Sequence, residues 1–246
     1  MATAYELAFL SHFCYKAHTG QSTRVFEIPT VAEEDYNPKF LGPTQINSSK
    51  PGRSVWAIVS DVGLYNDMYC ATFKNLQTSE IVFAFRGTRT DGIANFLTDL
   101  AIDIIHLAFR QSPYIEEAKN YLSSNITNNA IITGHSLGGY LALSMAFYFR
   151  NNRIATFNAP HVISKVGHGV DLTKAIYQDN FKTNKIISYN ARMDFASGLT
   201  SIFGNGGLKM DDIIKYEKLP WAGTHGIEPM INQLKKRKGN VDWNKK

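Results

Sequence analysis

Residues 130–146 read AIITGHSLGGYLALSMA and contain the corner that decides the fold. The apolar run 130–133 is typical of a buried parallel strand, and the alanine- and leucine-rich residues beyond it predict a helix over 137–150. The segment between them predicts a sharp turn, in which glycines flank Ser136 because a β-carbon there would strike the crossing strand and helix. Such a turn holds a serine on a strained backbone with its hydroxyl exposed, so Ser136 is predicted to be a nucleophile.

The Gly-x-Ser-x-Gly pattern is a weak signal by itself. In a chain with this glycine and serine content it arises by chance on the order of one time in ten. The strand before it and the helix after it favour the nucleophile over an ordinary strand-to-helix turn.

Length and composition bound the class of protein. A chain of 246 residues with 44% hydrophobic content can form one large α/β domain, and we expect a single domain over 1–246, without linker or repeat. The formal charge of +5 comes from the terminal stretch 235–246, which has six basic residues and one acidic residue. The rest is neutral, so nucleic acid binding is not expected. This basic tail is either a solvated end or a weak, transient contact with an anionic membrane surface.

Cysteine usage and the N-terminal residues bear on the compartment. Cys14 and Cys70 fall in an apparent helix and an apparent strand, which predicts buried free thiols. No Sec-type signal and no run of transmembrane length is visible. We therefore expect a soluble protein, cytoplasmic by default, with secretion by a non-Sec route left open.

Periodicity and turn residues predict the remaining elements. Residues 3–17 have helical spacing, 19–54 are expected to be long surface loops, and three short strands in an antiparallel start to the sheet are expected at 55–60, 68–73 and 80–85. Later elements are expected as helices over 113–122 and 171–181, strands over 153–157 and 185–189, and a helix after residue 226.

Two further motifs carry a resemblance to a known family. Residues 85–88 read Phe-Arg-Gly-Thr and residues 95–100 read Asn-Phe-Leu-Thr-Asp-Leu, some fifty and forty residues before Ser136. With the Gly-His-Ser-Leu-Gly-Gly corner, they make the stretch from about 80 to 225 resemble the class 3 (fungal-type) lipases of the α/β-hydrolase superfamily, as a short bacterial-like member. The resemblance implies an α/β-hydrolase fold with a mostly parallel central sheet and helices on both faces.

The same resemblance implies an oxyanion hole. Thr88 would supply a backbone N–H and its hydroxyl, and Leu137 would supply a second N–H. Two preorganised donors near the positive end of a helix can stabilise the charge that develops on a carbonyl oxygen. The alternative for Thr88 is an ordinary loop threonine.

Three segments keep two interpretations each. Arg86 ends a buried strand, where it either pairs with Asp99 and supports the oxyanion loop or contacts substrate. The apolar stretch 93–109 is either a core helix or a lid that faces lipid. The glycine-containing stretch 199–218 is either a mobile specificity element or a plain surface loop.

A serine nucleophile needs an imidazole base and a carboxylate that orients it. In α/β hydrolases the chain order is serine, acid, histidine. Asp194 follows a predicted strand after Ser136, and His225 is the last histidine, set between Gly223-Thr224 and Gly226. A loop-capping aspartate and a surface histidine are the alternatives. Two departures from the family pattern are Asn158 and His161, where a glycine and an arginine are usual around Pro160.

The predicted activity is hydrolysis of carboxylic esters of lipids, acylglycerol or phospholipid, through Ser136, Asp194 and His225. No cofactor is expected, and no cluster has metal-ligand spacing. The alternatives are a phospholipase toxin exported without a Sec signal, with an immunity or carrier protein as partner, and a catalytically idle lipase-like interaction protein.

Overall fold

The computed structural model of the chain describes residues 1–16, 24–30, 40–42, 51–64, 68–87, 113–149, 151–160, 186–191, 215–219 and 227–235. In chain order its elements are α1 (Ala4–Lys16), β1 (Val25–Pro29), β2 (Phe40–Leu41), β3 (Arg53–Gly63), β4 (Tyr69–Asn75), β5 (Ile81–Arg86), α3 (Pro113–Asn125), β6 (Ile131–His135), α4 (Leu137–Ser144), the 3-10 turn η2 (Met145–Phe147), β7 (Arg153–Phe157), β8 (Ile186–Ala191), β9 (Lys215–Leu219) and α7 (Ile227–Lys235).

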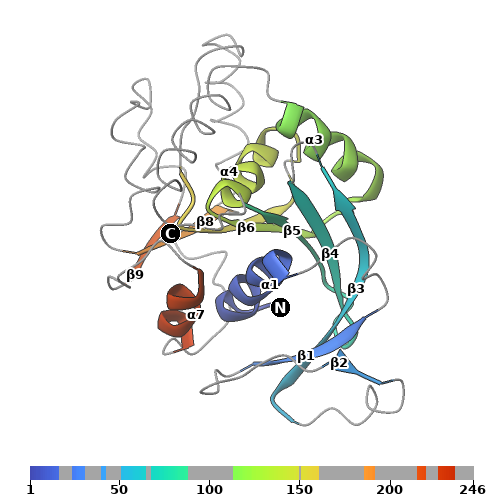
Figure 1. Cartoon of the computed structure of the whole chain (residues 1–246), viewed down its shortest axis with the longest axis vertical. Helices are drawn as coiled ribbons and strands as arrows, with labels where there is room; N and C mark the ends of the chain where they lie inside the picture. Colours follow the sequence, from blue (N-terminus) through green and yellow to red (C-terminus); the bar gives the residue numbers. More distant parts are fainter. Residues whose placement is uncertain are drawn as a thin grey trace.

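The described strands form one nine-stranded sheet of order β2-β1-β3-β4-β5-β6-β7-β8-β9 (Figure 1). Neighbours are antiparallel from β2 to β5 and parallel from β5 to β9. The α/β fold expected from the sequence is confirmed, and the parallel part of its mixed sheet is β5 to β9. Because parallel strands end at the same edge, the carboxyl ends of β5 to β8 lie together, where α/β sheets bind ligands.

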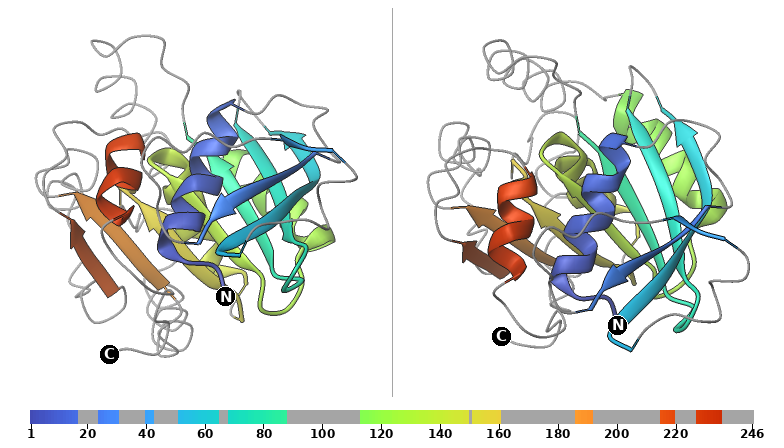
Figure 2. Two further views of the ribbon diagram at one scale, coloured as in Figure 1. Left: turned by 90° about the horizontal axis from the view of Figure 1, so that it is seen from below. Right: turned by 60° about the horizontal axis from the view of Figure 1, so that its bottom comes forward.

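Helices cover both faces of this sheet. Helices α1 and α7 lie side by side on one face, and α3 and α4 lie on the other (Figures 1 and 2). Strand β6 contributes side chains to the apolar cores on both faces of the sheet. Ile131 belongs to the core under α1 and α7, and Ile132 belongs to the core under α3 and α4. A strand buried on both faces has a continuous apolar run, as 130–132 does.

A capping box starts helix α1. The backbone N–H of Thr3 donates to Glu6 Oε2 at 2.7 Å, and the N–H of Glu6 donates to Thr3 Oγ1 at 3.1 Å. The two side chains thereby satisfy two helix-end donors reciprocally. Glu6 also accepts a hydrogen bond from the indole of Trp56 on β3, which fixes the start of the helix against the sheet.

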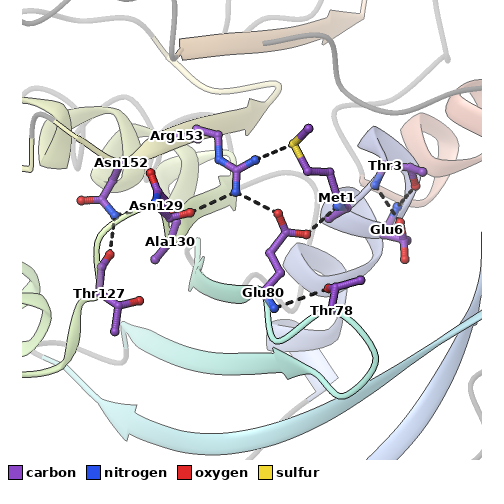
Figure 3. Close-up of polar contacts among 11 residues, drawn as sticks. Met1, Thr3, Glu6, Thr78, Glu80, Thr127, Asn129, Ala130, Asn152 and Arg153 are labelled. Atoms are coloured by element: carbon purple, nitrogen blue, oxygen red, sulfur yellow. Dashed lines mark hydrogen bonds and ion pairs between the residues drawn. The ribbon is translucent and has the colours of Figure 1, made fainter.

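A partly buried ion pair joins the residue before β5, the start of β7 and the residues before α1 (Figure 3). Arg153 Nη2 lies 2.8 Å from Glu80 Oε1, and the backbone N–H of Ala2 donates to Glu80 Oε2 at 2.6 Å. The Arg153 guanidinium also donates to the carbonyl of Asn129. These contacts lie at the edge of the sheet opposite the carboxyl ends of the parallel strands.

Most predicted elements are confirmed. The antiparallel start is β3, β4 and β5, and the predicted helix over 3–17 is α1. The helix that starts at Pro113, the strand over 153–157, the strand near 185–189 and the helix after 226 are α3, β7, β8 and α7.

Three predictions were wrong in detail. The 19–54 region is not all loop, because β1 and β2 lie in it and β1 pairs with β3. The helix after Ser136 ends at Ser144 and tightens into η2 instead of reaching residue 150. The 199–218 stretch ends in a strand, β9, which pairs with β8.

Other predictions concern residues outside the described ranges. They are the apolar stretch 93–109, Asp99, the helix over 171–181, most of 199–218, His161 and the basic tail beyond 235. Among the described helices, none combines the length and apolar character needed to cross a membrane.

Candidate active site

Ser136 occupies the corner between β6 and α4 on a strained backbone. Its φ is 55° and its ψ is −128°, a conformation that residues other than glycine rarely adopt. Such a conformation costs of order 1–3 kcal/mol and persists only where its surroundings enforce it. Here the Ser136 N–H donates to the carbonyl of Phe157 at 3.0 Å, and the Ser136 carbonyl accepts the N–H of Tyr140 at 3.0 Å.

Three glycines make the corner sterically feasible. A β-carbon on Gly134 would overlap the backbone of Gly138, and one on Gly138 would overlap the carbonyl of Phe85 in β5. A β-carbon on Gly139 would lie 2.6 Å from the β-carbon of Ala159. The predicted reason for these glycines, close approach of helix and sheet, is confirmed.

The Ser136 hydroxyl has no hydrogen-bond partner among the described residues, and its side chain is buried, with the residue 2% exposed. A buried hydroxyl usually bonds to a neighbour, so an unpaired one is a candidate functional group. Its proton and lone pairs are available to a base and to an electrophile, which is what a nucleophilic serine requires.

The end of β5 lies against the nucleophile corner. A β-carbon on Gly87 would lie 2.9 Å from the carbonyl oxygen of His135 and 3.3 Å from the nitrogen of Leu137. Leu137 is the first residue of α4, so its N–H has no acceptor within the helix and lies at the positive end of the helix dipole. The predicted oxyanion donor Leu137 is thus next to the segment that leads to Thr88.

Tyr15 of α1, on the sheet face that also carries α7, contacts both the end of β5 and the residue before Ser136. Its hydroxyl accepts the N–H of Gly87 at 3.2 Å and lies 3.0 Å from Nδ1 and 3.4 Å from the carbonyl oxygen of His135. Burial raises the pKa of Tyr15, so the phenol is protonated at neutral pH and has a proton to donate to His135. Sequence reasoning missed this residue.

Arg86, the last residue of β5, stacks on an aromatic ring. It is 7% exposed, and its guanidinium carbon lies 5.2 Å from the centroid of the Tyr69 ring, whose hydroxyl donates to Asp61 at 2.7 Å. A guanidinium is held this way by cation–π attraction. The stack supports a structural role for Arg86, and its predicted pairing with Asp99 lies outside the described residues.

Asn158 ties β7 to β8 at the same edge. It is fully buried with a φ of 44°, its N–H donates to the carbonyl of Tyr189 at 2.9 Å, and its Oδ1 accepts the N–H of Ala191 at 2.8 Å. Asn158 thus combines a left-handed backbone with a side-chain bond to Ala191 at the end of β8, three residues before Asp194.

The structure places two of the five predicted site residues. Ser136 and Leu137 are adjacent at the corner, and Leu137 is near Gly87. Thr88, Asp194 and His225 lie outside the described residues, so their meeting with Ser136 stays a prediction. The described segments nearest to them in sequence, which end at Gly87 and Ala191 or begin at Ile227, belong to β5, β8 and α7.

Comparison with known proteins finds similarity in structures only. No protein-family model matches the sequence, and no curated protein matches it. Among solved structures, a Penicillium expansum triacylglycerol lipase matches with 14% identity and a TM-score of 0.40, over 90% of this chain and 79% of its own. Lip2 lipase of Yarrowia lipolytica matches with 15% identity and a TM-score of 0.42, over 67% and 66%.

A Rhizomucor miehei lipase in complex with its propeptide matches with 15% identity and a TM-score of 0.40, over 60% of this chain. The match spans about half, 53%, of the Rhizomucor chain. The activity in each name is that of the named protein. At this low identity, each match is a resemblance to a fungal lipase.

Proposed function

We propose that the protein is a serine hydrolase that cleaves carboxylic esters of lipids. The observation that carries the proposal is Ser136, whose buried hydroxyl has no hydrogen-bond partner in the described part of the chain and whose backbone has φ 55° in a strand-to-helix corner. The surrounding fold maintains a costly conformation there, and strain of this kind clusters at functional sites.

The proposed reaction passes through an acyl-enzyme. His225, oriented by Asp194, removes the proton of Ser136, whose Oγ attacks the ester carbonyl carbon. The amides of Leu137 and Thr88 and the Thr88 hydroxyl stabilise the oxyanion. The imidazolium then protonates the departing alcohol, and water activated by the same histidine releases the carboxylic acid.

Two described contacts support this arrangement. The Leu137 N–H is unpaired within its helix and close to Gly87, which directly precedes Thr88. The bond from Ala191 to Asn158 fixes the end of β8, from which the chain continues to Asp194.

Substitution of Ser136 by alanine tests the nucleophile. S136A should lower hydrolysis of p-nitrophenyl esters by about a thousandfold or more and abolish labelling by a fluorophosphonate probe, because the attacking oxygen is gone. The matched control is S144A, which removes a buried hydroxyl from the same helix. Ser144 donates to the Tyr140 carbonyl one turn earlier in α4, so S144A should keep both signals.

Outcomes of this assay separate the alternatives. Hydrolysis and labelling retained by S136A would refute the assignment, and an inert wild-type protein would favour an idle lipase-like interaction protein. D194N and H225A should lose activity to a similar extent. Rates on ester chains of increasing length, then on mixed phospholipids and triacylglycerols, identify the lipid class.

A further inference from the structure

We propose that Tyr15, on the N-terminal helix, is a positioning residue for the proposed hydrolase reaction. Its hydroxyl joins the end of β5, which leads to the oxyanion loop, to the residue before the nucleophile. This inference rests on the proposed function and assigns to α1 a part in catalysis that none of the sequence motifs indicates.

The Tyr15 hydroxyl contacts the ends of two neighbouring strands, β5 and β6. Its oxygen accepts the N–H of Gly87 at 3.2 Å. On the other side it lies 3.0 Å from Nδ1 of His135 and donates to the carbonyl oxygen of the same residue at 3.4 Å. Gly87 precedes Thr88 and His135 precedes Ser136. The proposed oxyanion donor Thr88 and the proposed nucleophile Ser136 therefore each directly follow in sequence a residue that contacts the Tyr15 hydroxyl.

Close packing shows that the contact is built into the fold. Gly87 is buried, and a β-carbon on it would lie 2.5 Å from the Tyr15 hydroxyl. Only glycine therefore lets the strand end approach the phenol this closely. Without the hydroxyl the buried Gly87 N–H would lose its acceptor, a loss that typically costs about 1–3 kcal/mol and that the strand end could relieve by moving.

A second contact on the same helix face shows what is particular to Tyr15. Ser11, one turn earlier, lies with its Oγ 3.0 Å from Thr133 Oγ1 on the same strand as His135. The rise over four helical residues, about 6 Å, nearly matches the spacing of two strand residues, about 6.7 Å, so the two contacts are in register. Ser11 is as buried as the core, but it bonds two residues farther from the corner and does not reach Gly87.

The test compares Y15F with S11A, using S136A as the inactive reference. Y15F removes only the hydroxyl. If Tyr15 positions the oxyanion loop, kcat on a p-nitrophenyl ester and the rate of fluorophosphonate labelling should both fall about 10- to 100-fold while KM stays within about twofold of wild type. S11A should lower Tm and keep kcat within about twofold.

Two results would overturn the inference: Y15F with wild-type kcat and a lowered Tm, or S11A with a loss of kcat equal to that of Y15F. A wild-type protein that neither hydrolyses esters nor reacts with the probe would overturn the proposed function itself, which distinguishes the two failures.

A second variant keeps the test valid if Y15F does not fold. Replacing Tyr15 by 3-fluorotyrosine preserves the shape and makes the oxygen a weaker acceptor for the Gly87 N–H. A positioning role predicts a lowered kcat at unchanged KM and a shift of the single fluorine resonance when the probe modifies Ser136. A resonance and a kcat that both stay unchanged would contradict the role.

Discussion

At the scale of single residues, the site depends on backbone conformations that few side chains tolerate. Ser136 and Asn158 both have positive φ, at 55° and 44°. The N–H of Ser136 donates to the carbonyl of Phe157, and the side chain of Asn158 accepts the N–H of Ala191, and these bonds hold the two conformations. At Ser136 the hydroxyl is buried, in contrast to the exposed hydroxyl that the corner motif predicts, and it has no hydrogen-bond partner among the described residues. At Asn158 the left-handed backbone turns the chain at the end of β7, and the amide oxygen accepts the N–H of Ala191.

Substitutions at Asn158 should separate the stability that its bond to Ala191 contributes from the cost of its left-handed backbone. N158G loses the bond to Ala191 but tolerates the left-handed backbone, and should cost about 1–3 kcal/mol of unfolding free energy. N158A loses the same bond and adds a left-handed alanine, for a further cost of roughly 1 kcal/mol. Urea denaturation of the two variants measures the difference. Equal stability of N158A and N158G would show that the backbone at 158 is not strained.

At the scale of elements, α1 holds three parts of the structure together. From one helix, Ser11 contacts Thr133 in β6 and Tyr15 contacts the ends of β5 and β6. His12 Nε2 lies 3.3 Å from Glu228 Oε1 at the start of α7, the helix that follows His225 in the chain. Helix α1 thereby links β6, which leads to Ser136, and β5, which leads to Thr88, to α7, which follows His225 in the chain.

Two of the ion pairs differ in exposure, so their loss should cost different amounts of unfolding free energy. Arg153 and Glu80 are 16% and 8% exposed in their side chains, whereas Lys119 and Glu116 on α3 are 34% and 59% exposed. R153M leaves the Glu80 carboxylate buried without its cation and should cost about 3 kcal/mol or more. K119M breaks a pair that water screens and should cost less than about 1 kcal/mol.

Thermal or urea unfolding of both variants provides the comparison. A double variant, R153M with E80Q, should recover part of the loss because the uncompensated charge is gone. Similar costs for R153M and K119M would mean that the joint between β5, β7 and the residues before α1 contributes little.

At the scale of the whole molecule, the sheet separates two apolar cores with one cysteine in each. Cys14 lies in the core under α1 and α7, and Cys70 in the core under α3 and α4. Both are fully buried free thiols, as the sequence predicted. Burial raises the pKa of Cys14 from 9.0 to about 12 and raises that of Cys70 well above its ordinary value.

Stability should therefore fall in alkaline solution. An unfolded Cys14 thiol ionises near pH 9 and the folded thiol does not ionise until about pH 12, so the stabilisation present below pH 9 is lost progressively as the pH rises between these values. The unfolding free energy of wild type should drop more steeply above pH 9 than that of C14A, by up to about 1.4 kcal/mol per pH unit. Parallel pH profiles for the two proteins would contradict the buried thiol.

The sequence by itself determined the corner, the order of most elements and the identity of the nucleophile candidate. These features depend on short-range physics: glycines fit where a β-carbon cannot, and apolar residues alternate or recur with the period of a strand or a helix. Strands β1 and β2 were missed because turn-forming residues surround them, although Phe26 and Ile28 alternate with Val25 and Glu27 as in a half-buried strand.

Only the tertiary structure decided which residues support the site. Tyr15 meets Gly87 and His135 across 72 and 120 residues of chain, and Asn158 meets Ala191 across 33. No local pattern encodes such contacts, since a tyrosine on a helix face has the same spacing whether it packs against apolar side chains or bonds to a strand end. Packing of α1 on the sheet selects the partner, and that selection turns an apolar helix into part of the proposed active site.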